Sequence, residues 1–271
     1  MVSFIKTNFE YVFSAALRKQ KQQGDNMKKT LSLLAFLAVT GMASTPVQAA
    51  NHYVSALAGF SWLNDNDVTY TSDYKVGGDK WKNFFDSGFT GVAALGCDYG
   101  STRLEAEAGY QRNDWTDKWS NITAGKASVY SLMANGFYDI PLGGNAEIYG
   151  MAGVGVAQVN FEGDYYVDTY SGVYPRANGP ITTSRALNYK SHATTFAYQI
   201  GAGIAIPLSK GVKLDARYRY FATTDFTYTG PSETSLGFDP GSGNFSTNWY
   251  DPGYNTSVCS HSVLLGLRID L

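Results

Sequence analysis

Residues 103–112 read RLEAEAGYQR, and this stretch decides which way the protein's sheet faces. Charged side chains at positions 103, 105 and 107 alternate with apolar side chains at 104, 106 and 108. Because successive side chains of a strand point to opposite faces, one face is ionic and the other is apolar. A water-soluble sheet would expose the charges, whereas a membrane strand would expose the apolar face. The remainder of the chain has to decide between these orientations.

An export signal is predicted near the start of the chain. A basic stretch at 27–29 precedes the apolar run LSLLAFLAV at 31–39, and the small residues of 47–49 follow. The apolar run is too short to cross a bilayer as a mature helix, and the order of the three regions is typical of a secretory signal peptide. We therefore predict a cleaved signal peptide at residues 27–49.

The signal sequence also divides the chain. A signal normally begins a chain, so Met27 rather than Met1 is interpreted as the true start, and residues 1–26 as a non-native extension from an upstream start. Residues 50–271 form the predicted exported domain. They contain 15 Lys and Arg against 21 Asp and Glu, a balance that argues against a nucleic-acid partner. The two cysteines, Cys97 and Cys259, are too few for a disulfide framework.

The alternation of 103–112 recurs along the exported domain. The predicted strands are 53–62, 89–99, 103–110, 129–139, 147–158, 194–208, 212–221 and 258–271. Short, turn-rich links follow the second, fourth and sixth strands, whereas the links after the first, third, fifth and seventh are long. Strand pairs joined tightly on one side and loosely on the other indicate an antiparallel up-and-down meander.

The second face of these strands indicates a membrane barrel. It carries glycine, serine and charges of both signs, while aromatic residues stand at the ends of the apolar stripes, as in interfacial girdles. We therefore predict an all-β fold: an eight-stranded antiparallel up-and-down transmembrane β-barrel with short periplasmic turns and four long extracellular loops. The predicted location is the bacterial outer membrane, and the alternative is a periplasmic or secreted β-protein.

Several strands also resemble a known family. LEAEAGYQR, SLMANGFYDIP, IYGMAGVGVA, AYQIGAGIAIPL, KLDARYRYF and HSVLLGLRIDL resemble strands of the small outer-membrane β-barrel family of opacity proteins and bacterial surface antigens. The first strand, YVSALAGFSW, is similar to that of OmpA-type barrels. The resemblance implies the barrel fold, a cell-surface location and insertion by the outer-membrane assembly machinery. Such barrels usually end in Phe, whereas this chain ends in Leu271.

Inward charges predict an ionic network inside the barrel, because eight strands leave an interior just wide enough for side chains to fill. Unpaired ions are costly there and paired ions are tolerated. The alternative is a narrow, charge-lined pore. The residues predicted to form the network are Arg103, Glu105, Glu107, Asp215, Arg217, Arg219 and Arg268. Within it, Glu105 and Glu107 are expected to meet Arg217, Arg219 and Arg268.

No catalytic or cofactor-binding motif stands out. His261 lies between two serines that would face the opposite side of its strand, which is unsuitable for a hydrolase. The acidic run at 64–67 lacks the later glycine and glutamate of an EF-hand calcium loop. We therefore expect neither enzyme activity nor a cofactor or metal.

The long loops carry the candidate specificity. Their aromatic residues would suit contact with an extracellular ligand or host surface, or would extend the barrel as hairpins and pack on one another. The candidate surface-contact residues are Trp81, Trp115, Trp119, Trp249 and Tyr250. The predicted role is structural, adhesive or antigenic and non-catalytic, with a small porin as the alternative. Expected partners are outer-membrane lipid and lipopolysaccharide, besides the assembly machinery.

Overall fold

The structure is a computed structural model, and it describes part of the chain. The described residues are 51–71, 80–115, 122–144, 146–167, 185–230, 233–239, 244–250 and 253–271. The signal peptide predicted at 27–49 and the extension predicted at 1–26 lie outside them and stay predictions. Within the described ranges, no helix is long and apolar enough to cross a membrane.

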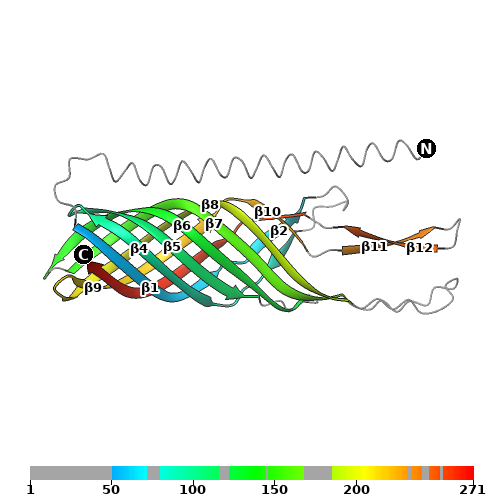
Figure 1. The fold of residues 1–271 in the computed structure, drawn as a ribbon, viewed down its shortest axis with the longest axis horizontal. Helices are drawn as coiled ribbons and strands as arrows, with labels where there is room; N and C mark the ends of the chain where they lie inside the picture. The colour runs from blue at the N-terminus through cyan, green and yellow to red at the C-terminus, as the bar shows by residue number, and fades with distance from the viewer. Residues whose placement is uncertain are drawn as a thin grey trace. The chain divides into compact units, whose positions relative to one another are not determined.

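Eight strands form a closed antiparallel barrel in the order β1-β14-β9-β8-β7-β6-β5-β4 (Figure 1). Strands that follow one another along the chain in the barrel pair with each other, and the pairing of β1 with β14 closes the ring. The predicted eight-stranded meander is therefore confirmed. The bounds are β1 (Asn51–Leu63), β4 (Gly88–Asp98), β5 (Thr102–Asp114), β6 (Ile122–Gly143), β7 (Ala146–Val167), β8 (Arg185–Ser209), β9 (Val212–Thr223) and β14 (Cys259–Asp270).

The three short turns lie at the end of the barrel where the chain terminates. Each contains a glycine with positive φ, a conformation that glycine adopts at no steric cost: Gly100 (97°), Gly144 (60°) and Gly211 (74°). At the same end, the amide of Leu271 donates to the carbonyl of His52, 2.8 Å away. The seam between first and last strand is thus hydrogen-bonded up to the final residue.

At the other end, the long links contain strands that were not predicted as separate elements. A four-stranded sheet has the order β10-β13-β2-β3, and β11 pairs with β12. Their bounds are β2 (Asn66–Tyr70), β3 (Lys80–Asn83), β10 (Phe226–Thr229), β11 (Glu233–Asp239), β12 (Asn244–Tyr250) and β13 (Gly253–Thr256). The barrel strands β6, β7 and β8 are also much longer than the roughly 10 residues a membrane requires.

The barrel is apolar outside and charged inside. Along β5, Leu104 is 46% exposed, whereas Glu105 is 3% exposed and Glu107 is fully buried. The same inversion holds elsewhere, since Phe60 and Leu265 are more than half exposed. A barrel of this kind needs an apolar environment around it, because so much apolar surface would be unfavourable in water.

Two interior tyrosines occupy space that glycines of the neighbouring strands leave open. A Cβ atom on Gly96 would lie 2.2 Å from Cζ of Tyr53, and a Cβ atom on Gly203 would lie 2.4 Å from Cζ of Tyr149. A side chain at either position would therefore have to displace the tyrosine ring. Both rings flank the charged side chains of the interior.

Candidate functional site

Arg217 lies at the centre of the charged interior. Its Nη1 lies 3.0 Å from Oε2 of Glu107, and its Nη2 lies 3.8 Å from carboxylate oxygens of both Glu105 and Asp215. Its Nε donates to Oη of Tyr149 at 3.2 Å, and that hydroxyl in turn donates to Asp215. One buried guanidinium from β9 thus joins carboxylates of β5 and β9.

Arg103 is a second anchor, nearer the short turns. Its guanidinium binds Asp139 in bidentate fashion, with Nε 2.6 Å from Oδ2 and Nη2 2.8 Å from Oδ1. The guanidinium carbon lies 4.4 Å from the ring centroid of Phe137, within cation–π range. Nη1 of the same group is 3.8 Å from Glu105. Arg103 and Arg217 therefore share Glu105.

Two amides complete the surroundings of Glu107. Nε2 of Gln199 donates to Oε1 at 3.1 Å, and Nδ2 of Asn135 donates to Oε2 at 3.1 Å. Arg219 approaches the same carboxylate, with Nη1 3.5 Å from Oε1. Glu107 thus contacts two arginines and two amides, as a buried ion requires.

Arg268 contacts a different carboxylate from the ones we expected. It donates to Glu147 of β7, not to Glu105 or Glu107, and Lys213 lies 2.8 Å from the same carboxylate. The reason is the position of Arg268 along the barrel axis. Arg268 pairs directly with Lys213, and Lys213 lies two residues nearer the short turns than Asp215. The expected grouping of Arg268 with the two β5 glutamates is therefore corrected.

Sequence reasoning missed Asp139, Glu147 and Lys213. Alternation along the predicted strands could have found them, because each shares a strand face with other inward residues. With these three included, the paired interior charges balance. They comprise the basic residues Arg103, Lys213, Arg217, Arg219 and Arg268 and the acidic residues Glu105, Glu107, Asp139, Glu147 and Asp215.

Above the charged layer, towards the long loops, an apolar cluster fills much of the interior. Beside it, the buried polar side chains of Ser61, Gln111, Asn113 and Ser260 hydrogen-bond to one another. Phe161 lies at the centre of the apolar cluster, with ring centroids 4.8 Å from Tyr228, 6.3 Å from Phe226 and 6.1 Å from Trp115. Other members of this cluster are Leu63, Val68, Val129, Met133, Val159, Phe221, Tyr254 and Val258. The residues of β10 and β13 thus fold into the same core as the barrel wall.

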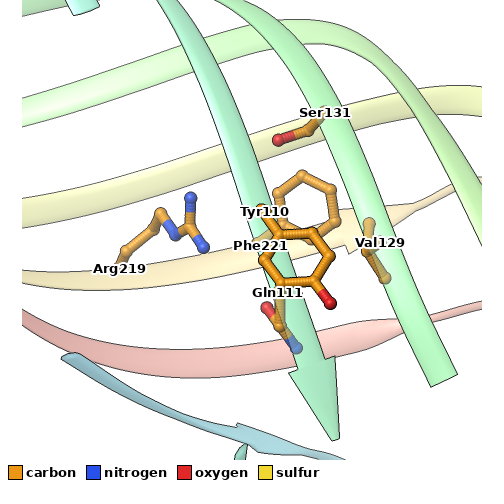
Figure 2. A pocket seen from close by; sticks show the side chains of 6 residues that line it. All are labelled: Tyr110, Gln111, Val129, Ser131, Arg219 and Phe221. Atoms are coloured by element: carbon orange, nitrogen blue, oxygen red, sulfur yellow. The ribbon is translucent and has the colours of Figure 1, made fainter. Parts of the chain in front are cut away.

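A narrow gap lies between the two layers, beside Arg219 (Figure 2). The gap does not admit a water molecule. The side chains around it come from β5, β6 and β9 and are Tyr110, Gln111, Val129, Ser131, Arg219 and Phe221. A gap of this size cannot hold a substrate.

The structure describes the side chain of one of the five candidate surface-contact residues, Trp115. Trp115 packs against Phe85, with centroids 5.9 Å apart, and against Phe161, and its side chain is partly exposed. An isolated bridge joins Phe85 to Trp115, and the contact of Trp115 with an extracellular partner stays a prediction. The backbones of Trp81, Trp249 and Tyr250 lie in β3 and β12, and their side chains lie outside the described set, as does Trp119 altogether.

Of the described residues with catalytic chemistry, Cys97 and His52 contact each other, with Sγ 3.4 Å from Nδ1, and His261 lies elsewhere. His261 lies on the outer face, with Nδ1 2.6 Å from Oη of Tyr218, while Ser260 and Ser262 are buried inside. Cys97 and Cys259 are both free. Among the described residues, no group of three or more His, Cys, Asp or Glu side chains could hold a metal ion.

A closed eight-stranded barrel with an apolar exterior and neutralised charges inside defines the class of transmembrane β-barrels. The family described as "Outer membrane protein beta-barrel domain" matches residues 31–255 of the chain. The chain belongs to this family, and its β-barrel is a bacterial outer-membrane barrel. The end with the short turns is accordingly periplasmic, and the end with the long loops is extracellular.

Individual relatives match the chain at low sequence identity. An outer membrane protein of Gluconacetobacter diazotrophicus is 29% identical over 258 residues, which cover 86% of this chain and 62% of the relative. An uncharacterized protein of Brucella abortus is 29% identical over 149 residues, 54% of this chain and 48% of the relative. The chain therefore spans about half to three fifths of the length of these relatives.

Two solved structures are also similar to this chain. Neisserial surface protein A aligns over 81% of this chain and 97% of its own, with a TM-score of 0.43 and 15% identity. The outer membrane protein OprG from Pseudomonas aeruginosa aligns over 82% and 97%, with a TM-score of 0.45 and 13% identity.

The pair of Arg103 and Asp139 gives a test of the interior network. Arg103→Met leaves a buried carboxylate without its bidentate partner, and we expect the free energy of unfolding to fall by about 3 kcal/mol. The double variant Arg103→Met/Asp139→Leu should recover most of this loss, because both charges are gone. Urea unfolding in detergent micelles, followed by heat-modifiable gel migration, measures both. Equal losses in the single and double variants would contradict the pairing.

Proposed function

We propose that the protein is a closed, non-catalytic outer-membrane barrel that presents its extracellular segments for contact at the cell surface. The observation that carries the proposal is that two layers of side chains fill the barrel interior. An ionic layer around Arg217 fills the middle of the barrel, and an apolar layer around Phe161 fills its extracellular end. Such a barrel has the properties of a scaffold rather than of a conduit.

The apolar layer argues against the porin alternative. A charge-lined pore needs a continuous polar path, whereas Phe161, Val159 and Val258 are each no more than 1% exposed. Moving an ion past these side chains would remove its hydration without offering partners. Eight strands also leave less room than the larger barrels that conduct solutes.

The extracellular part offers a stem with an inserted hairpin. β10 and β13 pair from Phe226 with Thr256 to Thr229 with Gly253, and Tyr228 and Tyr254 are buried in the apolar layer. The segment between them contains the β11–β12 pair, which carries Trp249 and Tyr250. A firmly packed stem bearing an aromatic-rich hairpin suits adhesive or antigenic contact with an extracellular ligand or host surface.

Planar-bilayer recording tests the closure. We expect the refolded wild-type barrel to show no reproducible single-channel steps, because the apolar layer blocks the axis. The double variant Phe161→Ser/Val159→Ser opens a polar path through that layer and serves as the comparison. Regular steps from the wild type, at the same frequency as from the double variant, would contradict the proposal.

A hairpin deletion tests surface contact. Removing residues 231–252 and joining Gly230 to Gly253 by a two-residue turn keeps the β10–β13 stem and the apolar layer. We expect binding of the purified protein to host cells or extracellular matrix to fall at least about tenfold, while heat-modifiable migration is kept. The control replaces 231–252 by a shuffled sequence of equal composition. Undiminished binding by the deleted protein would rule out the hairpin as the contact element.

A further inference from the structure

On the outer face of β5, β6, β7 and β8, the side chains become more polar towards the extracellular end. Directly paired residues of the four strands form rows across this face. Moving outward from the periplasm, the rows are Ala108–Leu132–Val156–Phe196, Tyr110–Tyr130–Gln158–Thr194, Arg112–Ser128–Asn160–His192 and Asp114–Lys126–Glu162–Lys190. The face is therefore apolar first, then aromatic and polar, and finally charged.

The aromatic row marks the edge of the membrane. The rings of Tyr110 and Tyr130 lie 5.0 Å apart, and tyrosines prefer the level where acyl chains meet headgroups. The two rows beyond them follow at about 7 Å per row along the strand. They consequently lie at the height of phosphate and sugar groups of the outer leaflet.

Positive charge exceeds negative charge on these rows. Glu162 faces two ammonium groups, since Nζ of Lys126 lies 3.0 Å and Nζ of Lys190 lies 3.9 Å from its Oε2. Arg112 contacts Asp114 at 3.4 Å, with its side chain half exposed. Three permanent cations and His192 thus share two carboxylates.

The rest of the barrel wall lacks this charge. On β1, β4, β9 and β14 every described Lys and Arg side chain takes part in the interior network, and the outer face carries instead Trp62, Phe89, Tyr220 and His261. The cationic rows are therefore confined to one side of the barrel. A general requirement for positive charge at the membrane surface would distribute it around the whole circumference.

We propose that this face of β5–β8 binds the phosphate groups of the glycolipid that forms the outer leaflet. Guanidinium and ammonium groups bind phosphate oxygens strongly. The exposed ion pairs with Asp114 and Glu162 are weak, so a phosphate can replace or join them. Below the cations, Gln158 and Asn160 can contact sugar hydroxyls, while Leu132 and Phe196 face the acyl chains.

The test uses the full barrel in neutral detergent micelles with diphosphorylated lipid A as the probe. The variant is Arg112→Gln/Lys190→Gln, which removes the two most exposed cations of the face. The matched control is Lys82→Gln/Lys210→Gln, which removes two exposed cations from β3 and from a periplasmic turn. Native mass spectrometry gives the bound fraction, and heat-modifiable migration verifies the fold of each variant.

We expect the variant to bind lipid A about tenfold more weakly than the wild type, and the control to bind like the wild type. Lipid A with both phosphates removed should bind wild type and variant equally. Equal lipid A affinity of wild type and variant would overturn the proposal, as would an equal loss in the control. Inorganic phosphate that binds the wild type as tightly as lipid A would show a free-anion site instead, and would also overturn it.

Discussion

Backbone hydrogen bonding in lipid is the constraint on which the rest of this structure depends. No water is present to satisfy an open sheet edge, so the sheet must close on itself. β1 pairs with both β4 and β14, and the pairing with β14 runs from Tyr53 to Leu63. Once the sheet is closed, alternate side chains of each strand face the lipid, and the others face the narrow interior of the barrel. The inverted pattern of residues 103–112 follows from closure in an apolar solvent.

The narrow barrel interior imposes a second constraint. Charged side chains there have little water around them and must neutralise one another. Arg217 contacts carboxylates of two strands, and Arg103 binds Asp139 across a neighbouring pair. Replacing these ions by apolar groups need not weaken the fold, since buried ion pairs contribute little net stability. Their larger effect is on register, because a slip of one residue would turn every inward charge to the lipid. The apolar cluster around Phe161 needs no such matching of charges, because its side chains are held by packing.

Sequence reasoning predicted the features that follow from the alternation of apolar and polar residues along each strand. The eight strands, their antiparallel order and the inward direction of Glu107 and Arg217 follow from a period of two and from the unequal link lengths. It did not predict which charges meet, because strand tilt and stagger set the heights of residues on different strands. Arg268 therefore meets Glu147, which the sequence places far from it. Sequence reasoning left open whether the long links form extra strands, because β2, β3, β10 and β13 are short and Trp115 is held by an isolated bridge to Phe85. Such contacts join distant segments and leave no local pattern.

The orientation of β5 is the central claim, and spin-label accessibility tests it most directly. A nitroxide is attached at position 104 through Leu104→Cys, in a Cys97→Ser/Cys259→Ser background, with the barrel reconstituted into lipid vesicles. Collisions with dissolved oxygen should greatly exceed collisions with a water-soluble nickel chelate, as for a side chain among acyl chains. Dominant collisions with the nickel chelate would place Leu104 in an aqueous environment and contradict the account.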